Sequence, residues 1–304
     1  MPGTVHPAVS DAGTWSVVVV NFEAGPLLLG CVRSLLADDS AGVPEVVVVD
    51  NGSSDGSVAA LRAAFPDVAV IDPGRNLGYA GAANRGIATT TTAVVAVANA
   101  DLVVTPGLAG AMSARLDAEP DLAVVGPALL NPDGSQYPSA RVHVSTTDAV
   151  GHALFGRLFP RNRFTRRYRQ LDEQWDRTRD VDWVSGALMF FRRSALDSVG
   201  GWDERYFMYM EDVDLCWRLR RLGWRIAYDP SGRATHIGGV STATRPYRMI
   251  AEHHRAVYRF ADRRWQGPQR LLLLPAACFL TLRAVVDMAG RALRARPEPP
   301  RVSG

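Results

Sequence analysis

Two neighbouring carboxylates, Glu211 and Asp212, are the residues of this sequence that most directly suggest chemistry. They lie in the stretch FMYMEDVDLCWRLRRLGW (207–224), at the start of a predicted apolar helix. At about 100° per residue, both project within roughly 50° of the centre of the apolar stripe formed by Leu215, Leu219 and Leu222. A carboxylate held beside buried surface can accept a proton, and capping of the helix is the structural alternative.

Other ionisable residues nearby are expected to have no chemical role. Asp214 projects onto a different face together with Arg218 and Arg221, so we expect a solvated ion pair there. His253 and His254 in AEHHRAVYRF fall on a predicted amphipathic helix, and we expect neither to take part in chemistry.

Acidic and amide side chains follow the ends of two apolar runs. Asp50 ends EVVVVD (45–50), and Asn99 and Asp101 follow AVVAVA (93–98). A carboxylate at the end of a buried strand needs a hydrogen-bonding or charged partner. The carboxylate of Asp101 could have Mg²⁺ as this partner. This ion takes one or two protein carboxylates and completes its shell with phosphate oxygens and water. The NGSSDGS turn after Asp50 also has the composition of an ordinary strand-to-helix connection.

The segment GRNLGYAGAANRG (74–86) is glycine-rich but lacks the G-x-G-x-x-G spacing of a dinucleotide fingerprint. One interpretation is a capped helix start with small packing residues. The other is a helix N-terminus beside a phosphate group, with Asn76 and Asn84 as hydrogen-bonding side chains.

The elements that must position these residues alternate between short β-branched runs and helix-like segments. The runs are SVVVVNF (16–22), EVVVVD (45–50), VAVID (68–72), AVVAVA (93–98) and LAVVG (122–126). Such strands indicate an α/β fold with a mostly parallel central sheet flanked by helices, in which ligands collect at the carboxyl ends of the strands. Beyond them we expect a hairpin at LLNPDGSQYP, a solvated Arg-rich segment or substrate flap over 156–180, and two short strands in WRIAYDP and RATHIGG.

The composition of the chain argues against some classes of protein and indicates a cellular compartment. The chain has 304 residues, and its net charge of only +3 argues against an extended nucleic-acid groove. Cys31, Cys216 and Cys278 are far apart and lack metal-site spacing, so a reducing cytoplasm is expected. We expect a flexible leader (1–14), a catalytic domain (15–265), an amphipathic helical segment (266–296) and a disordered tail (297–304).

The order of these motifs resembles the inverting family 2 glycosyltransferases with the GT-A fold. The resemblance rests on Gly201-Trp202-Asp203-Glu204, Phe207, Glu211-Asp212, Arg218, Gly223-Trp224 and His236 in THIGG. It covers roughly residues 15–265 and is closest to the rhamnosyltransferase-like branch, which is similar to actinobacterial cell-wall galactofuranosyltransferases. It therefore implies a GT-A-like nucleotide-diphospho-sugar transferase.

The resemblance also implies roles for particular residues. Asp212 matches the catalytic base, with Glu211 orienting it or binding an acceptor hydroxyl. Asp101 and His236 match ligands of Mg²⁺ or Mn²⁺, although Asn99-Ala100-Asp101 has lost the first acid of the family's D-x-D motif. The remaining implied positions contact the nucleotide-sugar (Asn21, Asp50, Asn76, Gly78, Asn84, Asn99 and Asp101) or shape the donor and acceptor pocket (Trp183, Gly186 and Trp202).

The expected reaction moves a sugar, with L-rhamnose from dTDP-rhamnose as the first candidate, onto a polyprenyl-diphosphate-linked or growing cell-wall glycan. Alternatives are a UDP-sugar transferase of the galactofuranose type and a nucleotide- or glycan-binding module with impaired catalysis. A sugar-phosphate nucleotidyltransferase is disfavoured, because NFEAGPLLLG after the first strand contains no Lys or Arg.

The C-terminal segment suggests where the protein works. The uncharged run 271–282 is 12 residues long, which we expect to be too short to span a bilayer. Arginines follow it at helical intervals, which favours a helix lying on an anionic membrane through residues 270–296. The alternative is a helix docked on its own domain or at a homodimer contact. With no signal peptide at the N-terminus, we expect a peripheral protein on the cytoplasmic face of the plasma membrane.

Overall fold

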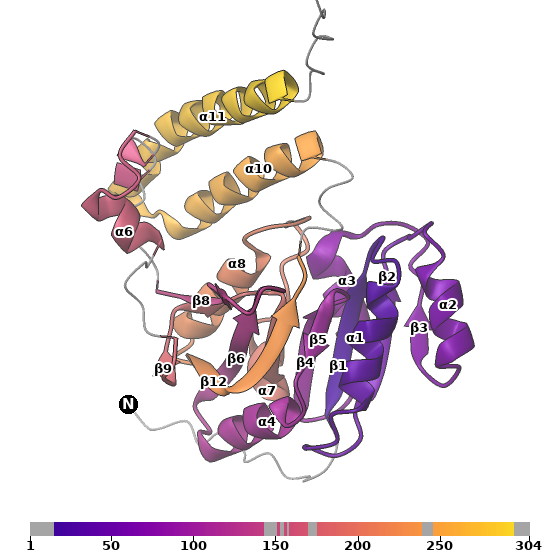
Figure 1. Cartoon of the computed structure of the whole chain (residues 1–304). Helices are drawn as coiled ribbons and strands as arrows, with labels where there is room; N and C mark the ends of the chain where they lie inside the picture. Colours follow the sequence, from indigo (N-terminus) through magenta and orange to yellow (C-terminus); the bar gives the residue numbers. More distant parts are fainter. Residues whose placement is uncertain are drawn as a thin grey trace, which may run out of the picture.

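An α/β domain carries two long C-terminal helices above one edge of its sheet (Figure 1). The computed structural model describes residues 15–142, 151–152, 155–156, 158–169, 175–238 and 246–294. The expected leader 1–14 and tail 297–304, and most of the connection after residue 142, lie outside these ranges.

The first half of the sheet is parallel, as the sequence predicts. Its strands are β3 (Ala69–Ile71), β2 (Glu45–Asp50), β1 (Ser16–Asn21) and β4 (Val94–Asn99), in this order from the edge. All residues of β1 and nearly all of β2 and β4 are buried, because helices cover both faces. The carboxyl ends of these strands consequently meet at one edge of the sheet.

The second half is mixed. After β4 the order continues with β11 (Leu188–Arg192), β6 (Leu122–Leu130), β12 (Arg225–His236) and β5 (Leu102–Val104). β11 runs antiparallel to both of its neighbours, whereas β12 is parallel to β6. The prediction of two short strands after the acidic helix was wrong: they form the single strand β12, which accommodates a register shift between Asp229 and Arg233. The predicted hairpin is confirmed by β6 and β7 (Gln136–Tyr137).

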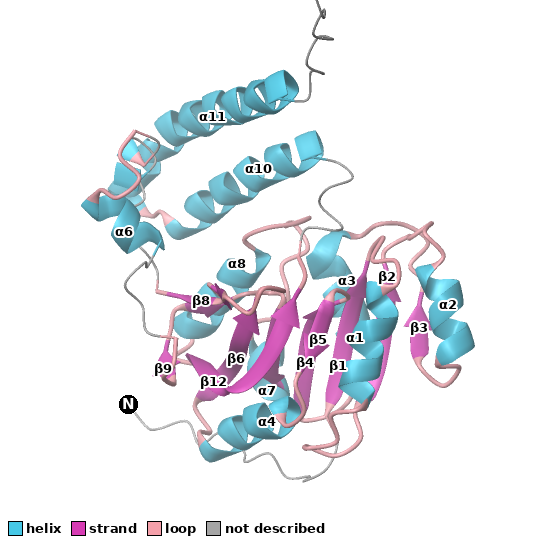
Figure 2. Cartoon of the chain, viewed as in Figure 1, coloured by secondary structure: helices cyan, strands magenta, loops and turns pink. Residues whose placement is uncertain are grey.

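Helices pack on both faces of the sheet (Figure 2). One face is covered by α1 (Leu27–Leu36) and α4 (Leu108–Ala118), the other by α3 (Gly78–Ile87), α7 (Arg193–Ser198) and α8 (Glu211–Arg221). The remaining small elements are α2 (Ser57–Ala64), β8 (Ala140–Arg141) paired with β10 (Trp183–Val184), β9 (Arg179–Asp180) paired with β12, and α6 (Arg163–Arg169).

The C-terminal helices are α10 (Pro246–Arg264) and α11 (Leu273–Arg294), joined by the 3₁₀ turn η1 (Gly267–Leu272). They lie antiparallel to one another above the carboxyl edge of the sheet (Figure 1). Arg263 fixes α10 to the domain, because its guanidinium lies 2.9 Å from Asp214 and 2.5 Å from Asp203.

Two sequence expectations about the helices need correction. Asp214 is fully buried rather than solvated, because Arg218 and Arg263 both bind its carboxylate beneath α10. Leu222 lies beyond the end of α8 and is 59% exposed, so the buried stripe of that helix stops at Leu219.

The length of the C-terminal helix also differs from expectation. Residues Gly267–Ala292 form one helical stretch that is long and apolar enough to cross a membrane by length and composition, with none of it buried. The expectation that this segment is too short to span a bilayer was wrong, because the helix extends beyond the uncharged run 271–282. Beyond that run the helix stays mostly apolar, and Arg283 and Asp287 form an i,i+4 pair at 3.9 Å.

Candidate active site

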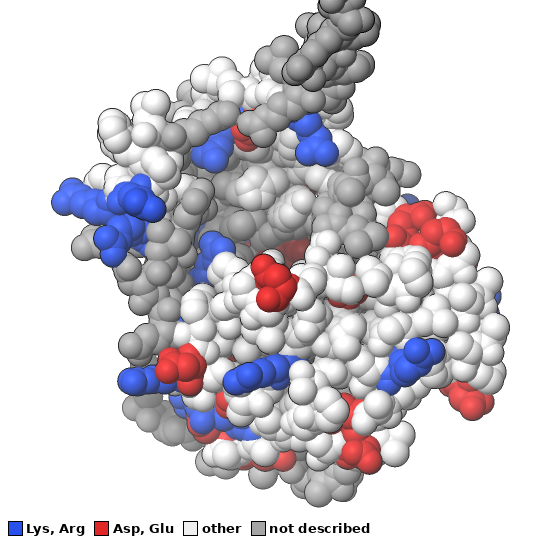
Figure 3. Space-filling view, in the orientation of Figure 1, with Lys and Arg blue, Asp and Glu red and all other residues white. Residues whose placement is uncertain are grey.

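A cleft of about 750 Å³ separates the carboxyl edge of the sheet from the C-terminal helices. It is the hollow below the two long helices in Figure 3. Its floor comes from the ends of β1 and β4, from β10 and from the start of α8, and one side of α10 closes it from above. This is the edge at which an α/β sheet is expected to bind its ligands.

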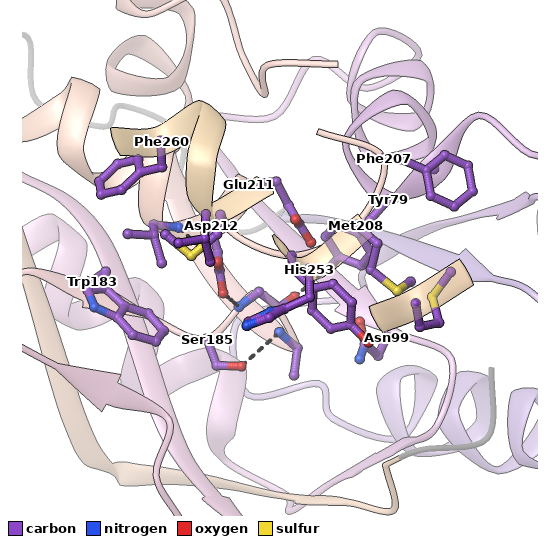
Figure 4. Close-up of a pocket in the computed structure, with 18 of the residues that line it drawn as sticks. Tyr79, Asn99, Trp183, Ser185, Phe207, Met208, Glu211, Asp212, His253 and Phe260 are labelled. Atoms are coloured by element: carbon purple, nitrogen blue, oxygen red, sulfur yellow. Dashed lines mark hydrogen bonds between the residues drawn. The ribbon is translucent and has the colours of Figure 1, made fainter. Parts of the chain in front are cut away.

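The two acids enter the cleft from the start of α8, as Figure 4 shows for Glu211 and Asp212. Tyr209 and Met210 immediately before the helix have φ values of 71° and 65°. Two consecutive side-chain-bearing residues in the left-handed region are uncommon and strained. This tight entry places Glu211 and Asp212 in the first turn, at the positive end of the helix dipole.

Asp212 is held by backbone amides on both of its carboxylate oxygens. The N–H of Gly186 donates to Oδ2 at 2.9 Å, and that of Val213 donates to Oδ1 at 2.8 Å. Burial raises the pKa of the Asp212 carboxyl above its usual range, and these two hydrogen bonds partly offset the rise. The arrangement gives an oriented carboxylate that is a stronger base than a solvated Asp.

Glu211 has a different environment although it is the next residue. It is only 8% exposed, and its Oε2 has no hydrogen-bond partner among the described residues. Burial and then the charge of Asp212 raise the pKa of Glu211 well above its usual value. One oxygen of Glu211 therefore has a hydrogen-bonding capacity that no described residue satisfies.

Asp101 and His236 meet at the end of β4 and β12. Oδ1 of Asp101 lies 3.3 Å from Nε2 of His236, and Oδ2 accepts a hydrogen bond from the Gly238 N–H at 3.0 Å. The same His236 nitrogen lies 3.2 Å from Nδ2 of Asn99. All three side chains line the cleft.

These residues suit a divalent cation that is shared with a diphosphate. Adjacent ligands of an octahedral ion with bonds near 2.1 Å are about 3 Å apart, which is close to the Asp101–His236 separation. No group of three or more His, Cys, Asp or Glu side chains suitable for a metal occurs within the described ranges. An ion at Asp101 and His236 would therefore need oxygen ligands from substrate and water.

Asn21 and Asp50, two of the residues expected to contact the nucleotide-sugar, belong to a buried hydrogen-bond network. Asn21 donates to Oδ1 of Asp50 at 2.8 Å, and Ser53 donates to the same oxygen at 2.6 Å. Neither Asn21 nor Asp50 lines the cleft in the described structure. Asn51, the next residue, does line it and was not singled out from the sequence, since its NGSS context reads as an ordinary turn.

Asn76 and Gly78 line the cleft through a tight turn. Oδ1 of Asn76 accepts from the Gly78 N–H at 2.9 Å, and the amide of Asn51 bridges Leu77 and Gly78 at 3.0 Å. Gly78 has φ +79°, and a Cβ there would collide with the backbone of Phe207. The glycine is thus required by the close approach of the loop that leads into α8.

Asn84 and Trp202 have structural contacts away from the cleft. Asn84 binds both the N–H and the carbonyl of Trp202 at 2.9 Å. The Trp202 ring is 2% exposed and packs edge-on against Tyr79 at a centroid distance of 5.5 Å. Trp183 and Gly186, by contrast, line the cleft, and the Gly186 N–H donates to Asp212. Figure 4 shows Trp183 among the side chains of the cleft.

Several cleft residues were not found by sequence reasoning. His253, expected to be inert, lines the cleft from α10, and its ring contacts Tyr209 at a centroid distance of 5.3 Å. Burial and the neighbouring His254 lower the pKa of His253, so it is neutral at pH 7. Arg141 and Arg264 also line the cleft. An amphipathic pattern shows that α10 packs against something but not that its partner is the active-site cleft.

Comparison with known proteins agrees with this geometry. The family described as "Glycosyltransferase like family 2" matches residues 12–262. The N-acetylglucosaminyl-diphospho-decaprenol L-rhamnosyltransferase of Mycobacterium tuberculosis is 40% identical over 272 residues, which are 84% of this chain and 88% of that protein. Rhamnosyltransferase WbbL of Escherichia coli K12 is 36% identical over 84 residues, covering 28% of this chain and 32% of that protein.

Solved structures support the same architecture. A mannosyltransferase from Pyrobaculum calidifontis, in complex with GDP-Man and Mn²⁺, has a TM-score of 0.56 at 19% identity and covers 98% of this chain and 80% of that one. GalNAc-T7 with UDP, GalNAc and Mn²⁺ has a TM-score of 0.54 at 16% identity, covering 74% and 43%. At such identities the likeness concerns the fold alone. With the family match and the close relative, it shows that the chain is a glycosyltransferase that belongs to family 2 and has a GT-A-like fold.

Proposed function

We propose that this chain is an inverting rhamnosyltransferase that moves L-rhamnose from dTDP-L-rhamnose to a sugar linked to a polyprenyl diphosphate. The observation that carries this proposal is 40% identity across nearly the whole length of a relative named for that transfer. Both acids and both metal-ligand candidates line one cleft, which supports a single reaction centre.

Asp212 is the proposed general base. In an inverting transfer the acceptor hydroxyl attacks the anomeric carbon from the side opposite the leaving diphosphate, and a carboxylate must remove the hydroxyl proton. The amides of Gly186 and Val213 orient Asp212 for this step, while burial strengthens it as a base. Glu211, with its unpartnered Oε2, would hold the acceptor sugar.

Asp101 and His236 would hold Mg²⁺ or Mn²⁺ against the donor diphosphate, with Asn99 beside them. When bound, the ion offsets the negative charge that develops on the leaving diphosphate. Asn99 replaces an acid of the family motif, so the chain contributes one carboxylate to this ion. The Gly238 N–H fixes that carboxylate in place.

The C-terminal helices would bring the protein to the membrane that holds the acceptor. Leu271 and Leu274 of the η1–α11 segment are 81% and 74% exposed, and Leu158 and Phe159 near α6 are 76% and 63% exposed. In Figure 1, α6 lies at the same end of the molecule as the turn between α10 and α11, and Figure 3 shows arginines gathered there. We propose peripheral binding to an anionic bilayer on its cytoplasmic face.

A transfer assay tests the proposal. Purified protein with Mn²⁺ and a lipid-linked N-acetylglucosaminyl diphosphate should transfer sugar from dTDP-L-rhamnose at least tenfold faster than from UDP-galactofuranose. Transfer from UDP-galactofuranose alone would support the galactofuranose-type alternative. Nucleotide binding without transfer from either donor would support the binding-module alternative instead.

A further inference from the structure

The roof of the cleft carries a charged side chain that the proposed chemistry does not use. Arg264 lies at the end of α10 and lines the cleft. Among the described residues its guanidinium forms no ion pair or hydrogen bond, whereas its neighbour Arg263 is bound by two carboxylates. Burial lowers the pKa of the Arg264 guanidinium, and no acidic group offsets this effect. A partly desolvated cation that is always charged and lacks a partner is suited to an anionic ligand.

Apolar side chains from both C-terminal helices line the cleft together with Arg264. The cleft is lined by Phe260 from α10, by Trp265 directly after that helix, and by Phe279 and Leu280 from α11. α11 continues from these inner positions to an exposed apolar surface, where Leu274, Leu282 and Val285 are 74%, 65% and 58% exposed. One helix therefore presents apolar side chains both to the cleft and to the outside.

We propose that Arg264 and the apolar wall of α10 and α11 form the binding site for the isoprenoid diphosphate of the acceptor. Arg264 binds the diphosphate, and the isoprenoid chain follows Phe260, Trp265, Phe279 and Leu280 toward the exposed surface of α11. Arg141, whose Nε is buried without a hydrogen-bond partner in the described structure, is a second cation in the cleft. This assignment rests on the proposed function, because it names the part of the acceptor that the same cleft recognises.

The site is distinct from the proposed donor site in its chemistry. A donor diphosphate at Asp101 and His236 is held through a divalent cation, whereas Arg264 binds phosphate directly and needs no metal. Binding of a short isoprenoid diphosphate in the presence of EDTA therefore isolates the acceptor site from the donor site.

Calorimetric titration of the full chain with farnesyl diphosphate in EDTA tests the proposal. Farnesyl diphosphate should bind at least tenfold more tightly than either farnesol or inorganic pyrophosphate. Arg264→Gln should weaken this binding at least tenfold, and Phe279→Ala should weaken it severalfold without changing the affinity for pyrophosphate. Arg255→Gln is the matched control, because Arg255 is on the same helix with a side chain 72% exposed, and it should stay within twofold of the unmodified chain.

The proposal is overturned if pyrophosphate binds as tightly as farnesyl diphosphate, if binding requires a metal, or if Arg264→Gln binds normally. The transfer assay separates this outcome from failure of the proposed function. Arg264→Gln should raise the KM for the lipid acceptor at least tenfold, with a smaller change in kcat. If the KM for the acceptor is unchanged, the isoprenoid diphosphate site is overturned, but the proposed sugar transfer is not. Selective farnesyl diphosphate binding by a chain that transfers no sugar supports the site and contradicts the function.

Discussion

At the scale of single residues, Glu211 and Asp212 are adjacent in the sequence but have different hydrogen-bonding environments in the cleft. Glu211, Asp212, Asp101 and His236 stand out because carboxylates and histidine beside apolar runs need an explanation. The hydrogen bonds that distinguish Asp212 from Glu211 come from Gly186 and from the helix turn. Such contacts between distant segments, like the burial of Asp214 under Arg263, depend on packing that no local pattern reports.

The buried Glu211 should reduce stability at neutral pH. Its folded-state pKa is raised, so the folded protein binds this proton more tightly than the unfolded chain, and stability falls as pH rises above the unfolded value of 4.5. Glu211→Gln removes this titration and should raise the free energy of unfolding by about 1 kcal/mol at pH 7. Urea unfolding of both proteins at pH 5 and pH 7 measures the effect. An advantage of the variant that is larger at pH 5 than at pH 7 would contradict the assigned pKa direction.

At the scale of elements, local patterns predicted the parallel strands well, because short β-branched runs are typical of strands that are buried on both faces of a parallel sheet. They did not predict that β11 enters antiparallel between β4 and β6, since pairing partners are chosen by the whole sheet. They also gave no position for α10 above the cleft. An amphipathic pattern specifies an apolar face and leaves its partner open.

The Arg263 contacts should hold α10 onto the catalytic domain. Arg263 binds Asp214, which is fully buried. Without Arg263, Arg218 is the one cationic partner of Asp214 that remains among the described residues. Arg263→Met should therefore lower the free energy of unfolding by about 2 kcal/mol. Arg255→Met, which removes an exposed i,i+3 pair with Glu252, should change it by less than about 0.5 kcal/mol. Equal effects of the two substitutions in urea unfolding would show that the Arg263 contacts do not stabilise the docked helix.

At the scale of the whole molecule, metal and nucleotide should bind together. Asp101 and His236 are too few ligands to retain a cation alone, and the donor diphosphate completes the set. Thermal unfolding should show a small shift with Mn²⁺ alone and with dTDP alone, and a shift several degrees larger than their sum with both. Asp101→Asn should abolish this excess. A full shift from Mn²⁺ without nucleotide would contradict the shared site.

Membrane binding should depend on the exposed leucines of the C-terminal segment. Changing both Leu271 and Leu274 to Glu adds negative charge to the surface proposed to meet an anionic bilayer. Flotation with vesicles rich in anionic lipid should recover the unmodified chain and lose most of this variant. Val43→Glu, at a position 73% exposed on the catalytic domain, is the control and should float normally. Equal recovery of all three proteins would show that Leu271 and Leu274 of the C-terminal segment do not contact the membrane.

The proposed reaction requires that Asp212 accept the proton of the attacking hydroxyl. The most direct measurement is the rate of sugar transfer by Asp212→Asn at saturating donor and acceptor, with the affinity for dTDP and Mn²⁺ measured in parallel. This role of Asp212 predicts a kcat lowered by at least about 100-fold with nucleotide affinity within twofold, because Asn keeps the side-chain shape but cannot accept the proton. A variant that transfers sugar at the unmodified rate would contradict it.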